Sequence, residues 1–368
     1  MLSVDHRSLI KATVPLLEAG GEALTSHFYR LMLAEYPQVR PLFNQAHQAS
    51  GDQPRALANG VLMYARNIDR LEALGPLVGQ IVAKHVSLQI LPEHYPIVGT
   101  CLLRAIREVL GEAVATDAVI DAWAAAYQQL AELLIRAEEA LYAENAAAPG
   151  GWRGARAFRV SRKVRESEEI TSFYLQPEDG QTLPAFTPGQ YIGLRLLLDG
   201  EEVRRNYSLS AAPNGLDYRI SVKREPGGRV SNHLHARVGE GDRLELFPAA
   251  GAFVLHPSDK PLALISAGVG ITPALSMLEA ALPSGRPIHF IHCARHGGVH
   301  AFADWVERMA AQHPQVRQFV CYSEPREADA GHATGLLSRD RLAEWLPAER
   351  NLDARSRLQD APRSGGRR

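Results

Sequence analysis

The 368-residue sequence has little cysteine, little net charge and no long hydrophobic run, and each absence excludes a class of protein. The three cysteines, Cys101, Cys293 and Cys321, are far apart and form no CxxC pair. This argues against a disulfide framework and a cysteine-based zinc site, and without CxxCH no c-type haem can be attached. We therefore expect a reducing compartment, the cytoplasm.

Charge is nearly balanced, with 40 Lys and Arg against 41 Asp and Glu and a formal net charge of −1. This balance gives no indication of nucleic acid as a partner. No apolar run approaches the roughly 18–20 residues that a transmembrane segment needs. The first residues, MLSVDHRSLIKATVPLL, are interrupted by charges and do not read as a signal peptide.

The hydrophobic pattern changes twice along the chain, which predicts a multidomain protein. Residues 1–144 follow a helical period and predict an all-α domain. The apolar stripes on its predicted helices include Leu24, Phe28, Leu31 and Met32, and Val119, Trp123, Tyr127, Leu130 and Leu134. After a small-residue linker at 145–151, residues 152–256 alternate with period two between turn pairs, which predicts an antiparallel β-barrel or sandwich. Residues 257–350 alternate short apolar runs with helical stretches, which predicts a parallel α/β sheet.

The stretch SAGVGITP follows a predicted strand and precedes a predicted helix over residues 273–282. Gly268 and Gly270 permit a sharp turn and a close approach of the backbone to a ligand, and Pro273 suits the first helical turn. The helix N-terminus would then form a phosphate site. A purely structural turn explains the same pattern, because proline replaces the third glycine of the dinucleotide fingerprint.

The second predicted domain carries residues suited to a flat, phosphorylated ligand. In RRNYSLS, Arg205 can pair with a phosphate and Tyr207 can stack on a ring, while Tyr191 in GQY supplies a second aromatic. In GGRVSNHLH, two glycines precede a predicted helix start with Ser231 as N-cap, which is again an anion site. The alternative is a barrel with a solvated arginine and two half-buried tyrosines.

The stretch KHVSLQILPEHYPIVG places a histidine on an otherwise apolar helical face, because Leu77, Ile81 and His85 recur every four residues. Taken alone, this pattern is explained by a buried histidine with a backbone partner.

Together, RNYSLS, GGRVS and AGVGITP resemble the ferredoxin-reductase family over residues 152–345, and an all-α domain in front of such a reductase resembles a flavohaemoglobin. The resemblance implies FAD in the barrel and NADH or NADPH in the α/β domain. It assigns the FAD contacts to Tyr191, Arg205, Asn206, Tyr207, Ser208, Gly228, Val230 and Ser231. It assigns the NAD(P)H contacts to Gly268, Val269, Gly270, Ile271, Thr272 and Pro273.

The globin part of the resemblance assigns six residues around haem b. They are the proximal iron ligand His85, the haem-packing Phe43, the distal Tyr29 and Gln53, and the proximal partners Tyr95 and Glu138. A carboxylate on the second imidazole nitrogen fixes the tautomer and strengthens the ligand. Otherwise Glu138 is a solvated charge on the last helix.

The activity that the resemblance implies is that of a nitric oxide dioxygenase. Electrons pass from NAD(P)H through FAD to haem b, where NO and O₂ are converted to nitrate. We expect a cytoplasmic monomer whose partners are these two small molecules. The alternatives are an O₂- or NO-binding haemoprotein with an impaired reductase, and a reductase with a non-haem helical domain.

The end of the sequence departs from the family pattern. Family members continue into a further strand with a Cys-Gly-Pro turn and close with an aromatic-Gly-Pro segment near the flavin. Here residues 351–368 are rich in Arg, Ser and Gly, and we expect them to be disordered. We therefore expect an incomplete NAD(P)H domain, retained globin chemistry, weakened FAD binding and impaired NAD(P)H turnover.

Overall fold

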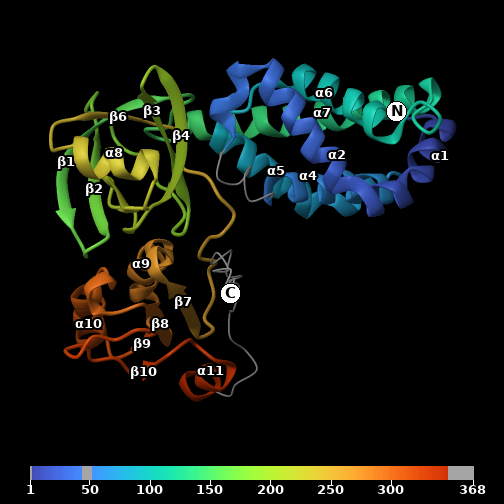
Figure 1. The fold of residues 1–368 in the computed structure, drawn as a ribbon. Helices are drawn as coiled ribbons and strands as arrows, with labels where there is room; N and C mark the ends of the chain where they lie inside the picture. Colours follow the sequence, from blue (N-terminus) through green and yellow to red (C-terminus); the bar gives the residue numbers. More distant parts are fainter. Residues whose placement is uncertain (1, 44–51, 347–368) are drawn as a thin grey trace. The chain divides into compact units, whose positions relative to one another are not determined.

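The computed structural model describes residues 2–43 and 52–346, and helices, an antiparallel sheet and a parallel sheet follow one another in the predicted order (Figure 1). The chain divides into two compact units. One comprises residues 1–155 together with 193–205, and the other comprises residues 156–192 together with 206–368.

The first unit is built from amphipathic helices around one core. Of the predicted stripe, Leu24, Phe28 and Met32 are buried and Leu31 is half-buried. Thr116 caps the last helix by accepting a hydrogen bond from the Val119 N–H. The main helices are α1 Val4–Ala12, α2 Val14–Glu35, α4 Asp52–Arg66, α5 Gly75–Leu88, α6 His94–Leu110 and α7 Asp117–Ala147, so that α7 continues into the segment predicted as a linker.

An antiparallel sheet forms most of the barrel, in the strand order β4-β3-β6-β1-β2-β5. An isolated bridge pairs Leu209, just after β4, with Ile220 of β5, which brings the two ends of the sheet together. Phe158, Phe173 and Ile220 fill the interior. The elements are β1 Arg156–Arg165, β2 Ile170–Pro177, β3 Tyr191–Leu198, β4 Glu201–Ser208, β5 Tyr218–Lys223, α8 Arg229–Arg237 and β6 Arg243–Leu246.

The α/β domain has a parallel sheet in the order β10-β9-β8-β7. On one face, Leu264 and Phe290 belong to the core that α9 and α10 complete. On the other face, Phe319 stacks on Trp345 of α11. The elements are β7 Leu262–Ala267, α9 Ile271–Ala281, β8 Ile288–Ala294, α10 Ala303–Gln312, β9 Val316–Tyr322, β10 Ala333–Thr334 and α11 Arg339–Trp345.

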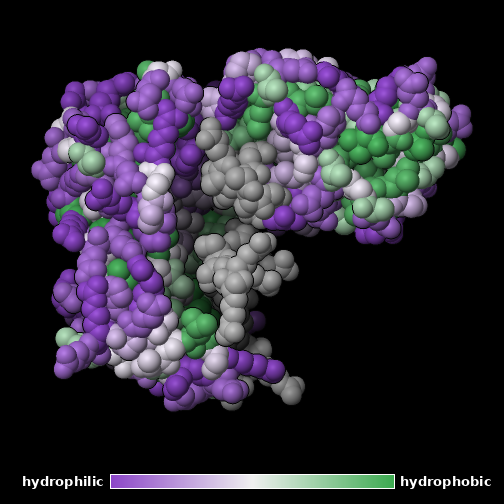
Figure 2. All heavy atoms as spheres, in the orientation of Figure 1, coloured by the Kyte–Doolittle hydropathy of each residue, from purple (hydrophilic) through white to green (hydrophobic). Residues whose placement is uncertain are grey.

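The predicted disordered tail, residues 351–368, lies outside the described residues. Among the helices that are described, none has the length and apolar character needed to cross a membrane. In the view of Figure 2 the barrel and the α/β domain present a mostly hydrophilic surface, and larger hydrophobic areas occur on the helical unit.

Candidate functional site

His85 lies in the last turn of α5 and forms a closed polar cluster with one carboxylate and one phenol. Its Nδ1 is 2.7 Å from Glu138 Oε1 and 3.2 Å from the Tyr95 hydroxyl. Tyr95 donates to the same Glu138 oxygen at 2.6 Å. Glu138 is only 2% exposed, and a buried carboxylate needs hydrogen-bond donors, which here are His85 Nδ1 and the Tyr95 hydroxyl. The geometry therefore brings together three of the residues that the sequence predicted as one group.

The backbone around this cluster is fixed by neighbouring residues. Gln89 ends α5 in the left-handed conformation, with φ of 57°. The Tyr127 hydroxyl donates to the Tyr95 carbonyl oxygen at 2.7 Å, and a Cβ on Gly99 would lie only 2.6 Å from the Tyr127 ring. The sequence reasoning missed Gly99 and saw in Tyr127 only a member of the α7 stripe, because neither contact leaves a periodic signal.

The imidazole orientation determines what His85 can bind. Because Nδ1 faces the Glu138 carboxylate, Nδ1 is the nitrogen that carries the proton in the neutral imidazole, and the lone pair of that form is on Nε2. The His85 side chain is 31% exposed, and no described residue bonds to Nε2. A neutral imidazole that is held in this way is suited to ligate haem iron.

Tyr29 and Phe43 lie against one another on the helical unit. Their ring centroids are 5.6 Å apart in an edge-to-face arrangement. Tyr29 is 8% exposed, and burial raises the pKa of its phenol well above the ordinary value, so the hydroxyl keeps its proton. No described residue hydrogen-bonds to this hydroxyl, which leaves it as an available donor. Gln53, the second residue of α4, is half-buried.

On the barrel, Tyr191 stands at the start of β3 and exchanges two backbone hydrogen bonds of 2.9 Å with Ala250. Gly251 has φ of +117°, and a Cβ there would lie 2.8 Å from the Tyr191 ring. The glycine therefore lets the backbone pass directly beside the aromatic ring, and any side chain would displace it.

The predicted residues of β4 are half-buried, namely Arg205, Asn206, Tyr207 and Ser208. The Asn206 Oδ1 atom is buried and has no hydrogen-bond partner within the described residues. Such an atom is costly unless a donor reaches it, and a bound ligand is one source of that donor. This unsatisfied oxygen, on the residue before Tyr207 in β4, fits a polar, planar ligand such as a flavin.

The predicted cap of α8 is wrong. The helix begins at Arg229, Gly228 is its N-cap, and no side chain caps it. Ser231 instead lies within the first turn, where its hydroxyl accepts from the Glu225 N–H at 3.2 Å. A Cβ on Gly228 would lie 2.4 Å from that hydroxyl, which explains the glycine. The first-turn N–H groups of α8 still have no helical acceptor and suit an anion.

The glycine turn of the α/β domain joins the end of β7 to α9. Gly268 has φ of +51°, and Gly268 and Gly270 are exposed, so the backbone is open to a ligand. The helix begins at Ile271, two residues before the predicted start. Ile271 and Thr272 are buried, so only their backbone can face a ligand. Pro273 lies in the first helical turn, as predicted.

Comparison with known proteins assigns each part of this geometry to a family. The Globin family model matches residues 26–134, the oxidoreductase FAD-binding domain matches residues 157–254, and the oxidoreductase NAD-binding domain matches residues 264–355. A flavohemoprotein of Pseudomonas aeruginosa is 76% identical over 96% of this chain and 90% of its own length.

The chain belongs to the flavohemoprotein family.

Other relatives agree with this placement. A flavohemoprotein of Burkholderia sp. is 68% identical over 96% of this chain and 90% of its own length. A crystal structure of a flavohemoglobin from Malassezia yamatoensis, with bound FAD and heme, superposes with a TM-score of 0.79 at 25% identity, covering 91% of this chain and 88% of that one. The FAD/NAD-binding domain of a nitric oxide dioxygenase from Vibrio cholerae gives 0.51 at 35% identity, covering 55% and 86%.

The flavohemoprotein fold therefore comprises a helical globin domain, an antiparallel FAD domain and a parallel NAD domain, as the sequence predicted. Its cofactors are haem, FAD and a nicotinamide dinucleotide, and the protein is an oxidoreductase of this family.

Proposed function

We propose that this flavohemoprotein is a nitric oxide dioxygenase that uses NAD(P)H as electron donor. The proposal is carried by one observation, the buried Glu138 carboxylate that holds His85 Nδ1 at 2.7 Å and the Tyr95 hydroxyl at 2.6 Å. A buried carboxylate has little reason to lie beneath a helix-borne imidazole unless that imidazole serves as a ligand on its other side.

Three cofactors complete the reaction. When bound, haem b supplies the iron at which NO and O₂ combine to form nitrate, and FAD converts the two-electron donor NAD(P)H into a source of single electrons. His85 would hold the haem through Nε2, and Phe43 would pack against it. Glu138 keeps the Nδ1 proton in place and so strengthens Nε2 as an electron donor to iron.

On the distal side the phenol of Tyr29 supplies a proton donor. Tyr29 is buried, its hydroxyl keeps its proton, and no residue in the described part of the chain hydrogen-bonds to that hydroxyl. A donor at this place would stabilise negative charge on a small diatomic ligand by hydrogen bonding. Gln53 would support the same polar pocket.

The reductase half binds and orients its two cofactors with different groups. The Arg205 guanidinium would pair with the FAD pyrophosphate, and Tyr191 and Tyr207 would cover the flavin ring. The unsatisfied Asn206 Oδ1 would accept from the flavin or its chain. The open backbone from Gly268 to Gly270 would admit the dinucleotide at the carboxyl edge of the parallel sheet.

The test is anaerobic absorbance spectroscopy of the protein loaded with haem and FAD, before and after NADH, followed by NO consumption in air. If the reductase half is functional, the haem bands should shift to the reduced form within seconds and NO should be consumed with NADH, whereas the impaired turnover expected from the sequence would slow or prevent both. His85→Ala should abolish both haem retention and NO consumption while flavin reduction continues. If dithionite reduces the haem but NADH does not, this would contradict the proposal and favour an O₂- or NO-binding haemoprotein.

A further inference from the structure

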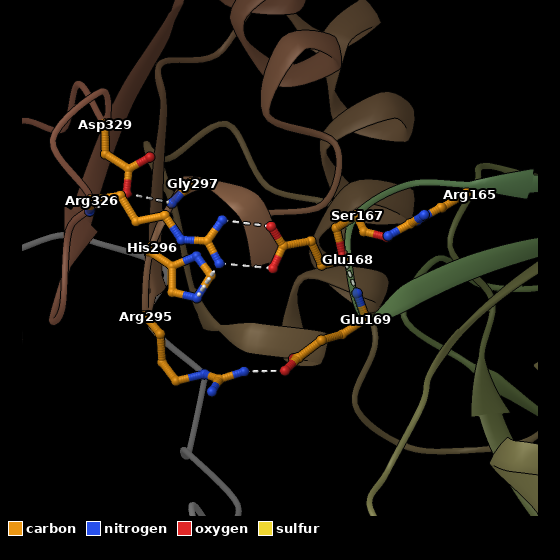
Figure 3. Close-up of polar contacts among 9 residues, drawn as sticks. All are labelled: Arg165, Ser167, Glu168, Glu169, Arg295, His296, Gly297, Arg326 and Asp329. Carbon is orange, nitrogen blue, oxygen red and sulfur yellow. Dashed lines mark hydrogen bonds and ion pairs between the residues drawn. The ribbon is translucent and has the colours of Figure 1, made fainter.

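The turn between β1 and β2 of the barrel reaches the ends of two strands of the α/β domain and forms ion pairs there (Figure 3). Arg326, in the loop after β9, forms a bidentate ion pair with Glu168. Its Nη1 lies 2.5 Å from Oε1 and its Nη2 lies 2.9 Å from Oε2. Arg295, just after β8, pairs with Glu169. We call these four side chains the clasp.

The backbone holds both sides of the clasp in place. On the barrel side, the Ser167 hydroxyl accepts from the N–H groups of Glu169 at 3.3 Å and Ile170 at 3.1 Å. On the other side, the Asp329 carboxylate accepts from the N–H groups of Gly297 at 2.9 Å and Arg326 at 2.7 Å. Two preorganised loops therefore meet, which lowers the entropy lost when the ion pairs form.

Direct backbone contact accompanies the charges. The Glu168 N–H donates to the Gly298 carbonyl oxygen at 2.9 Å. A Cβ on Gly298 would lie 2.3 Å from Glu168 Oε1, and a Cβ on Gly297 would lie 2.4 Å from Asp329 Oδ1. The two glycines thus leave just enough room for the carboxylates to dock. An isolated surface ion pair contributes little, but a bidentate pair within a network of this kind is of more consequence.

The place of the clasp links it to the chemistry. In a parallel α/β sheet, ligands bind outside the carboxyl ends of the strands. Arg295 and Arg326 follow the carboxyl ends of β8 and β9, and the Gly268–Gly270 turn follows that of β7. The clasp therefore joins the FAD-binding barrel to the edge of the α/β domain on which the dinucleotide would lie.

We propose that Glu168, Glu169, Arg295 and Arg326 are positioning residues that fix the nicotinamide edge against the flavin barrel for hydride transfer. In this step a hydride, one proton with two electrons, leaves C4 of the dihydronicotinamide, which is oxidised, and is accepted by the flavin, which is reduced. The inference rests on the cofactors of the proposed function, and it does not depend on NO as the substrate.

The experiment uses the full chain loaded with FAD and compares Arg326→Glu, Glu168→Arg and the double variant that exchanges the two charges. Flavin reduction by NADH is followed by anaerobic stopped flow. We expect each single variant to slow reduction at saturating NADH about tenfold, with the Kd for NADH changed less than about twofold, because misplacement affects transfer more than binding. The double variant should recover to within about threefold of the unsubstituted rate.

A second measurement needs no cofactor turnover. Hydrogen exchange of the Glu168 amide, whose N–H donates to the Gly298 carbonyl oxygen, should rise in both single variants and return in the double variant. Gly298→Ala, which changes no charge, should give the same exchange and the same slow reduction. Glu178→Gln is the matched control, because Glu178 is a barrel carboxylate paired with Arg243 at 3.0 Å and lies outside the clasp.

Single variants with unchanged reduction or unchanged exchange would overturn the proposal, as would a double variant that stays as slow as the singles. The proposal would also be overturned if NADH does not reduce the flavin of the unsubstituted protein. If NADH reduces the flavin but the protein consumes no NO, the proposed function fails and the clasp proposal is still decided by the variants.

Discussion

Acid should destabilise the α/β domain through two buried histidines, His292 in β8 and His300 in the segment that follows β8. His300 is 4% exposed, and its Nδ1 lies 2.9 Å from the Tyr322 hydroxyl, while its Nε2 is buried with no partner in the described part of the chain. Its ring centroid is 4.6 Å from that of His292. Burial lowers the pKa of His300 from 6.5 to about 4, and attraction by Asp304 opposes this only in part.

Proton linkage determines whether the domain loses or gains stability as the pH falls. The pKa of His300 is lower in the folded than in the unfolded protein, so the unfolded chain takes up the proton first. The stabilisation is complete above pH 6.5 and is lost as the pH falls toward 4. A pKa difference of about 2.5, at about 1.4 kcal/mol for each pKa unit, corresponds to a total loss of about 3.5 kcal/mol. His292, whose pKa is also lowered by burial, adds to the loss in the same direction.

Hydrogen exchange of the β8 amides between pH 7 and pH 4, corrected for intrinsic rates, measures this loss as a free energy of opening. His300→Asn should reduce the pH dependence by about one proton, whatever its stability at pH 7. His256→Gln, at an exposed histidine of the same unit, should leave the dependence unchanged. Equal slopes in the unsubstituted protein and His300→Asn would refute the reasoning.

Three further predictions concern the globin domain. Glu138→Gln should weaken haem retention about 10- to 100-fold, measured by transfer of haem to excess apomyoglobin, whereas Glu139→Gln next to it, on an exposed carboxylate, should not. Tyr29→Phe removes one donor worth about 1 kcal/mol and should raise the O₂ dissociation rate about fivefold by flash photolysis, and an unchanged rate would argue against a distal role. Gly99→Ala should cost about 1–3 kcal/mol in urea unfolding, because the new methyl group meets the Tyr127 ring, and a neutral result would mean that the ring moves freely.

Periodicity was sufficient for the architecture because it reports burial along one element. In the stripe predicted on α2, Leu24, Phe28 and Met32 are buried and Leu31 is half-buried. The change from a helical period to alternation, and then to strands that alternate with helices, matches the three folds. Local hydrogen bonding is harder to predict from the pattern. Ser231 has the residue type of a helix cap, but its hydroxyl bonds to the Glu225 N–H, and Gly228 takes the cap position.

Contacts between distant residues set the limit of the sequence reasoning. The pair of His85 and Glu138, 53 residues apart, was predicted only because the family pattern supplied it. Glu168 and Arg326 had no such pattern, and each reads as a solvated charge in a turn. His292 and His300 were hidden in the same way, since one histidine in an apolar strand gives no indication of its partner.

The clasp also has a consequence for how the chain is made. Glu168 and Arg326 are 158 residues apart, and Glu169 and Arg295 are 126 apart. At about 5–20 residues per second, the ribosome needs roughly 8–30 s to deliver Arg326 after Glu168 has been made. During that interval the barrel can fold while its β1–β2 turn carries two unpaired carboxylates, Glu168 and Glu169. These charges keep the turn hydrated until the α/β domain has been synthesised.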